Sequence, residues 1–163
     1  MVEYFEYIFA FLMSRFNLDA KCLDGWTYNT NTFKCYKFIP KKATWSEAHM
    51  DCMTKVTSPN PPALPITRVN LVSIRDDEEN HFVDSLLQSA HCQGAWIGGH
   101  ILGDGSWIWT DGSKWTYDNW KCGQIAREDS LSLKANGDWN VGRFSDILCG
   151  YVCQYLDLNQ FTN

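Results

Sequence analysis

The sequence predicts an α+β fold for this chain of 163 residues. Two segments begin with helix-capping residues and continue with apolar positions at helical spacing. Several short segments rich in aromatic and β-branched residues are separated by Asp-Gly and Asn-Gly turns, which is typical of hairpins. Seven cysteines in so short a chain indicate disulfide bonds and an oxidising compartment.

The first expected elements are a β-hairpin and a helix. Residues 22–38 place aromatic side chains around turn-forming Asp and Asn residues, and predict a hairpin closed by a bond between Cys22 and Cys35. A helix is predicted over residues 44–56, because Thr44 and a glutamate three positions later can form a capping box. The i, i+3, i+7 spacing predicts that its buried face consists of Trp45, Ala48 and Cys52.

A proline-rich stretch separates this helix from a short strand and a second helix. Four prolines between residues 59 and 65 exclude a helix or a central strand there, so a surface loop or a stiff insert is expected. Residues 70–74 are predicted to be a strand. The second helix is predicted to start at Asp76, with Glu79 as its capping-box partner, and to end near residue 88. Its predicted buried stripe consists of Phe82, Val83, Leu86 and Leu87.

From residue 95 onward the pattern is that of short β-strands joined by turns. The predicted strands have the sequences AWIGG, WIWT, LSLK, DWNV and LCGYVCQYL. The glycines of this region do not form a phosphate loop, because no strand–GxGxxG–helix order surrounds them.

Composition and motifs argue against several classes of function. The net charge of −5 and the lack of a dense Lys/Arg cluster disfavour nucleic-acid binding, which needs a basic face. No CxxC pair occurs, so a structural zinc site is disfavoured as well. The four histidines are scattered and no HExxH or GxSxG motif is present, so an enzyme is disfavoured.

Residues 1–21 allow two interpretations. The apolar stretch from Tyr7 to Met13 is too short to span a bilayer, and no transmembrane segment is expected. These residues are either a signal peptide cleaved after Ala20 or an amphipathic lead-in that packs on the domain, since acidic residues stand where a signal peptide usually carries basic ones. The cysteines favour secretion more strongly than this segment does.

In their order, these landmarks resemble the C-type lectin-like domain. The matching landmarks are Cys22 and Cys35, Trp45-x2-Ala48-x3-Cys52, Leu71 to Ile74, Trp96 to Gly99, Trp109 to Ser113, Asn119-Trp120, Glu128-Asp129, Trp139-Asn140 and Val152-Cys153. The resemblance covers residues 22–155 and leaves 156–163 as a C-terminal tail. It implies two helices that flank a small, mostly antiparallel sheet with a long upper loop region. The N-terminal hairpin marks the longer form of the domain.

The resemblance also implies a disulfide pattern. The family joins the cysteine of the first helix to that of the final strand, here Cys52 and Cys153. For the remaining bridge Cys92, Cys122 and Cys149 compete, because serine replaces the cysteine that usually follows the Glu-Asp pair. The expected bond is Cys122–Cys149, which would anchor the upper loop. Cys92 would then be the odd thiol, either buried or bonded to a second chain in a disulfide-linked dimer.

Sugar-binding members of this family hold a calcium ion in the upper loop. In these members the side chains that ligate the calcium ion come from a Glu-Pro-Asn or Gln-Pro-Asp triplet, a following Glu, and a Trp-Asn-Asp motif. Here the triplet is Gln124-Ile125-Ala126, Glu128 is kept, and Asn140 is followed by Val141. Calcium takes six to eight oxygen ligands, so a site with so few of them is predicted to be absent or very weak. No metal or other cofactor is therefore expected, although a displaced calcium site near Asp129, Asp138 and Asn140 is the alternative.

The tryptophans on either side of the upper loop are expected to divide between the core and the surface. Trp96, Trp109, Trp120 and Trp139 are expected in the core, whereas neighbouring aromatic residues are better candidates for exposure because Trp107 and Trp109 alternate on a strand. The predicted ligand-binding residues are Trp107, Trp115, Tyr117, Gln124, Glu128 and Asn140.

The function expected from the sequence is that of a secreted, extracellular recognition domain without catalytic activity. Its expected partner is a glycan or an extracellular protein, bound without calcium through the loops at 100–107 and 113–141. A calcium-dependent lectin with a displaced metal site is the alternative, and an enzyme is the least favoured reading.

Overall fold

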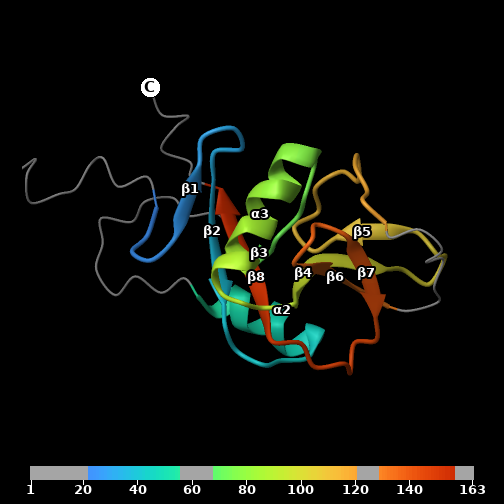
Figure 1. Cartoon of the computed structure of the whole chain (residues 1–163). Helices are drawn as coiled ribbons and strands as arrows, with labels where there is room; N and C mark the ends of the chain where they lie inside the picture. Colours follow the sequence, from blue (N-terminus) through green and yellow to red (C-terminus); the bar gives the residue numbers. More distant parts are fainter. Residues whose placement is uncertain (1–21, 56–67, 121–128, 157–163) are drawn as a thin grey trace, which may run out of the picture.

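The computed structural model describes residues 22–55, 68–120 and 129–156. Figure 1 shows two helices packed against a sheet, as the α+β prediction requires. The helices are α2 (Trp45–Thr54) and α3 (Asp77–Ser89). The strands are β1 (Thr27–Asn29), β2 (Lys34–Ile39), β3 (Asn70–Leu71), β4 (Gly94–Ile101), β5 (Trp107–Trp109), β6 (Ser130–Lys134), β7 (Trp139–Gly142) and β8 (Gly150–Leu156).

The sheet is mostly antiparallel, with the strand order β1-β2-β8-β4-β6-β7. In addition, β3 pairs with β8 and β5 pairs with β4. The single parallel pair in the described part of the sheet joins β4 to β8, with Ala95 opposite Gly150 and Trp96 opposite Tyr151. Strand β8, which follows every other described element in the chain, therefore lies in the middle of the sheet.

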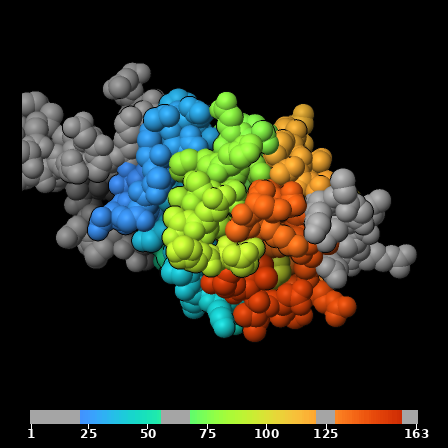
Figure 2. Space-filling view, in the orientation of Figure 1, coloured from blue at the N-terminus to red at the C-terminus, as the bar shows by residue number. Residues whose placement is uncertain are grey.

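The two faces of the sheet each carry a hydrophobic core. Side chains alternate along β8, so Val152 lies in one core, while Tyr151 and Cys153 lie in the other. Helix α3 packs Val83 and Leu87 into the Val152 core. Helix α2 packs its buried residues into the core of Tyr151 and Cys153, which confirms the predicted face of Trp45, Ala48 and Cys52. In the space-filling view, α3 covers the middle of the face shown (Figure 2).

The helix starts follow the sequence prediction in one case and depart from it in the other. In α2 the Thr44 hydroxyl accepts from the Glu47 amide, and the Glu47 carboxylate accepts from the Thr44 amide at 2.8 Å, a complete capping box. In α3 the Asp76 side chain accepts from the Glu79 amide at 2.8 Å. The Glu79 side chain does not complete a box with Asp76, because it turns into the protein interior instead.

Residues 56–67, which include the predicted proline-rich loop, lie outside the described residues. The strand predicted over 70–74 is only two residues long. The chain beyond it stays buried and bonded, since the Val72 amide donates to the Val152 carbonyl and the Gly98 amide donates to the Val72 carbonyl. A Cβ atom at Gly98 would lie 2.8 Å from the Leu71 carbonyl oxygen, so this close approach requires glycine.

Three disulfides join the described elements. Cys22–Cys35 and Cys52–Cys153 are present as expected. The third bond is Cys92–Cys149, so the predicted Cys122–Cys149 pair is wrong. The physical reason is the parallel pairing of β4 and β8, which places the residues just before both strands side by side, with the two Cα atoms 6.0 Å apart. Cys92 is therefore not the odd thiol; the remaining cysteine is Cys122, which lies outside the described residues.

Candidate functional site

The predicted ligand-binding residues gather at the end of the sheet formed by β5, β7 and the segment between β5 and β6. Trp107 lies in β5, Trp115 and Tyr117 follow it, and Asn140 lies in β7. Gln124 and Glu128 belong to residues 121–128, which lie outside the described part of the chain. The structure therefore places four of the six predicted residues.

The aromatic residues of this region form one cluster around the fully buried Trp139. Trp115 stacks on Trp109 with ring centroids 4.5 Å apart and an interplanar angle of 16°. Trp115, Tyr117 and Trp120 each meet Trp139 edge to face, at 5.7, 5.5 and 5.6 Å. Offset and edge-to-face pairs of this kind add about 0.5–1.5 kcal/mol each beyond the burial of apolar area. The rings of this frame are thus packed on one another and on the buried Trp139.

The exposure of these rings differs in detail from the prediction. Trp96, Trp109 and Trp139 are buried as expected, whereas Trp120, expected in the core, is half-buried. The candidates for exposure, Trp107, Trp115 and Tyr117, are half-buried too, because they pack on the core formed around Trp109 and Trp139. Each side chain is therefore only partly exposed to solvent.

The polar residues of β7 and its neighbours are bonded locally. The Asn140 side-chain amide donates to the Val141 carbonyl at 3.0 Å, and the Ser132 hydroxyl donates to the Asn140 carbonyl. Val141, which follows Asn140, is only 6% exposed and belongs to the core. Asp138 accepts from the Asn136 side-chain amide at 2.9 Å in the preceding turn. Among residues 22–55, 68–120 and 129–156, no group of three or more His, Cys, Asp or Glu side chains could hold a metal ion.

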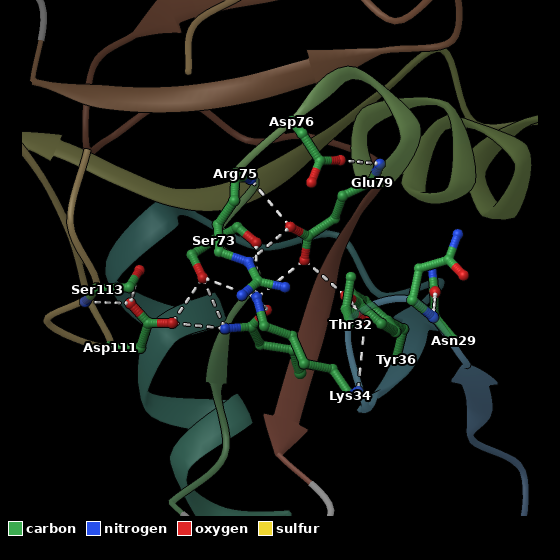
Figure 3. Close-up of polar contacts among 12 residues, drawn as sticks. Asn29, Thr32, Lys34, Tyr36, Ser73, Arg75, Asp76, Glu79, Asp111 and Ser113 are labelled. Atoms are coloured by element: carbon green, nitrogen blue, oxygen red, sulfur yellow. Dashed lines mark hydrogen bonds and ion pairs between the residues drawn. The ribbon is translucent and has the colours of Figure 1, made fainter. Parts of the chain in front are cut away.

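A buried ionic network lies where β2, β8 and the start of α3 meet, close to the aromatic segment, since the Tyr117 hydroxyl donates to the Asp77 carboxylate at 3.1 Å. The Lys34 ammonium is 2.8 Å from the Glu79 carboxylate and also donates to the Ser73 carbonyl and to the Gln154 side-chain oxygen. The Tyr36 hydroxyl donates to the same Glu79 oxygen at 2.6 Å. Figure 3 shows the side chains of Lys34 and Tyr36 from β2 close to that of Glu79 from α3.

Burial controls the titration of this network. Glu79 is 1% exposed and Lys34 is 7% exposed. Desolvation lowers the pKa of the Lys34 ammonium, while the Glu79 carboxylate opposes that change. Desolvation and the same carboxylate both raise the pKa of the Tyr36 hydroxyl far above its usual value. The network therefore contains an ammonium and a carboxylate that depend on one another inside the protein.

The sequence prediction missed this network. The spacing of Glu79 to Asp76 predicts a capping box, and the sequence pattern assigns no role to Lys34. One signal was available: Lys34 and the aromatic Tyr36 are two positions apart in the predicted hairpin, and residues at that spacing on a strand share a face. A lysine on a buried face needs an anionic partner, but the sequence does not say which carboxylate supplies it.

A half-open cavity of about 380 Å³ adjoins this network. Its walls come from the start of β2, the end of β8, the residues flanking β3, and the turn at 111–113. Polar and charged residues line it, among them Lys34, Arg68, Arg75 and Asp111, together with the apolar surfaces of Tyr155 and Leu156. The volume is within the range of small-molecule sites in proteins.

No arrangement typical of a nucleophilic enzyme emerges from the described residues. All six described cysteines are in disulfides, so none of them carries a free thiol. His81 bonds to the carbonyl of Asp77 on the surface of α3, and His49 and His100 lie against the ring of Trp45. None of the described helices is long and apolar enough to cross a membrane.

Comparison with known proteins points to one family. The family model described as the lectin C-type domain matches residues 66–155. The galactose-specific lectin nattectin of Thalassophryne nattereri is 30% identical over 133 residues, which cover 80% of this chain and 75% of that protein. The crystal structure of the C-type lectin CEL-I from Cucumaria echinata superposes with a TM-score of 0.73 at 28% identity, covering 83% of this chain and 98% of that one. The carbohydrate-recognition domain of cow CD23, solved in the presence of an oligosaccharide, gives a TM-score of 0.67 at 29% identity, with 83% and 95% of the two chains covered.

Proposed function

Because this chain belongs to the C-type lectin family, we propose that it is a secreted, non-catalytic recognition domain that binds a glycan or an extracellular protein. The names of its relatives support carbohydrate as the first ligand class to test, since nattectin is a galactose-specific lectin. Three disulfides support an oxidising, extracellular location. The proposed binding surface is the aromatic cluster of Trp107, Trp115 and Tyr117 together with β7.

We propose further that binding does not use the family's calcium site. The observation that carries this proposal is Val141, whose side chain lies in the core at the position where the family pattern has a calcium-ligating Asp. The sequence adds Ile125 and Ala126, which offer no side-chain oxygen. Calcium needs six to eight oxygen ligands, several of them carboxylates, and this chain has hydrocarbon at two of the positions that supply them, Ala126 and Val141.

The calcium proposal can be tested by thermal unfolding in chelator and in millimolar calcium. A ligand present at 100 times its Kd stabilises the native state by about 2.7 kcal/mol, which is readily measured. We expect no change in Tm, and we expect glycan-array binding to be the same with and without chelator. A clear rise in Tm with calcium, or signals lost on chelation, would favour the second candidate function, a calcium-dependent lectin with a displaced site near Asp129, Asp138 and Asn140.

The location of the binding surface can be tested with a matched pair of tryptophan variants. Trp107→Leu removes a half-buried ring at the proposed surface. Trp26→Leu removes a half-buried ring of the N-terminal hairpin, which packs on the Tyr155 ring of β8 with the ring centroids 4.9 Å apart. We expect the first variant to lose glycan-array signal and the second to keep it, provided that both have wild-type circular dichroism. Equal binding by both variants would show that the ligand lies elsewhere.

The sequence contains an odd cysteine, and the observed disulfides change its identity. With Cys92 bonded to Cys149, the cysteine left over is Cys122, in the segment between the aromatic cluster and β6. We propose that a disulfide-linked dimer, if this protein forms one, uses Cys122 and not Cys92.

A further inference from the structure

The polar cavity beside the Lys34–Glu79 network is a candidate for a second binding site. None of the residues of the aromatic cluster lines it, although the two are neighbours, since the Thr116 hydroxyl donates to the Arg75 carbonyl at 3.3 Å. Its volume of about 380 Å³ would hold a ligand of monosaccharide size.

The charges that line the cavity are mainly positive, although the whole chain carries a net charge of −5. Lys34, Arg68 and Arg75 line it, against the single carboxylate of Asp111. Lys34 is engaged by Glu79. Arg75 uses only its Nε, at 3.4 Å from a Glu79 oxygen, and its side chain is 42% exposed. Arg68 is exposed, and its guanidinium makes no hydrogen bond or ion pair with any residue that the structure describes.

The Asp111 carboxylate, in contrast, is fully engaged. One oxygen accepts from the Ser73 hydroxyl at 2.6 Å and from the Gln154 side-chain amide at 2.7 Å. The other accepts from the backbone amide and the hydroxyl of Ser113, at 2.9 and 2.6 Å. Figure 3 shows Asp111 between Ser73 and Ser113. With its acceptor sites occupied, Asp111 has little capacity to bind a ligand, so the charged groups left to bind one in the cavity are the two guanidinium groups.

A guanidinium offers paired N–H donors in a plane, which match the oxygens of a carboxylate or a sulfate. The cavity lining also contains the hydroxyl group of Ser113 and the apolar surfaces of Tyr155 and Leu156. Hydroxyl partners beside an apolar wall suit the hydroxyl groups and the C–H face of a sugar ring. We propose that this cavity binds a small acidic sugar, with Arg68 and Arg75 holding its oxyanion. The oxyanion is either the carboxylate of a uronic acid or a sulfate ester, which share this chemistry.

The proposal can be tested by titration calorimetry at low ionic strength with five ligands. Glucuronate and galactose 6-sulfate represent the two oxyanions, glucose and galactose are their neutral parents, and sodium sulfate is the oxyanion alone. We expect at least one acidic sugar to bind about tenfold or more tightly than its neutral parent, which lacks the charged hydrogen bonds, and than sulfate, which lacks the sugar ring. The tighter of the two acidic sugars identifies the oxyanion.

Three variants locate the site. Arg68→Gln and Arg75→Gln should each weaken binding of the acidic sugar about tenfold. Arg143→Gln removes an exposed positive charge from the loop before β8 and should leave binding unchanged. Arg68→Gln should also leave Tm unchanged, because Arg68 has no side-chain partner among the described residues. Trp107→Leu, which tests the proposed lectin surface, should retain binding in this cavity.

The proposal fails if neither acidic sugar binds, if sulfate alone binds as tightly as the sulfated sugar, or if Arg68→Gln binds like Arg143→Gln. Loss of acidic-sugar binding in Trp107→Leu, with binding kept in Arg68→Gln, would assign the sugar to the aromatic surface and overturn this site. The two proposals can therefore fail independently of each other.

Discussion

The Lys34–Glu79 pair provides the strongest quantitative test of the structure. Glu79→Gln keeps the size of the side chain and one oxygen acceptor but removes its charge. The Lys34 ammonium, 7% exposed, would then lie in the interior with only neutral acceptors, from Ser73 and Gln154. Breaking a buried ion pair on one side costs about 3–5 kcal/mol, because the remaining charge is desolvated without compensation. That is a large part of the 5–15 kcal/mol typical of a whole domain.

The measurement is urea unfolding at pH 7, followed by tryptophan fluorescence with the disulfides intact. The matched control is Glu78→Gln, which makes the same chemical change one residue earlier, at an exposed side chain whose described contact is with the Asn31 side-chain amide at 3.2 Å. We expect the control to lie within about 0.5 kcal/mol of wild type. A loss of less than about 1 kcal/mol in Glu79→Gln, or a loss equal to that of the control, would refute the assignment of a buried pair.

A double variant separates the buried charge from lost packing. Lys34→Met combined with Glu79→Gln removes both charges and keeps an amide oxygen for the Tyr36 hydroxyl. We expect it to be more stable than Glu79→Gln alone by about 2 kcal/mol or more, since removal of both charges of a buried pair is often close to neutral. In Glu79→Gln itself, desolvation of Lys34 is no longer opposed and its pKa falls further, so stability relative to wild type should recover as the pH rises. A double variant less stable than the single one would contradict this account.

Three further predictions concern histidine titration and the cysteines. Burial lowers the pKa of His49 and of His100 below the usual 6.5, so the unfolded chain binds protons first and the free energy of unfolding should fall as the pH decreases below about 6.5. Urea unfolding at pH 5 and pH 7 measures this fall, which should be smaller in the double variant His49→Gln/His100→Gln. A fall as large as that of wild type would contradict the role of these two histidines. Replacing Cys92 and Cys149 by Ser opens a loop with a sequence separation of 57 and should lower the free energy of unfolding by about 4 kcal/mol on the chain-entropy model. Thermal unfolding measures this loss, and an unchanged Tm would contradict the bond. Alkylation of the unreduced protein followed by peptide mass spectrometry should label Cys122 alone, or reveal it as the site of an interchain bond, whereas labelling of Cys92 would contradict the observed pairing.

Features set by neighbouring residues could be predicted from the sequence. The capping box of Thr44 and Glu47 and the buried face of α2 depend on spacings within one or two turns of helix, and both occur in the structure. The bond between Cys52 and Cys153 came from resemblance to a family, since nothing local relates two residues with a sequence separation of 101. The α+β architecture followed from the two kinds of pattern together.

Features set by contacts between distant segments could not be predicted. The Cys92–Cys149 bond results from the parallel pairing of β4 and β8, which no local pattern encodes. Glu79 fits a capping box by its spacing, but the buried ammonium of Lys34 competes for the same carboxylate, and the ion pair forms instead. At the candidate site the sequence identified the aromatic cluster, but it placed Trp120 in the core, whereas the ring is only half-buried.

The central position of β8 has a consequence for the order in which the protein can fold. The strand is synthesised after all other described elements, yet it pairs with β2, β3 and β4 and supplies one residue to Cys52–Cys153, while Cys149 directly precedes it. Until β8 leaves the ribosome, β2 and β4 have no strand between them, and two of the three native disulfides cannot close. Early oxidation would therefore trap the wrong cysteine pairs, and efficient maturation should require a disulfide isomerase acting after synthesis is complete.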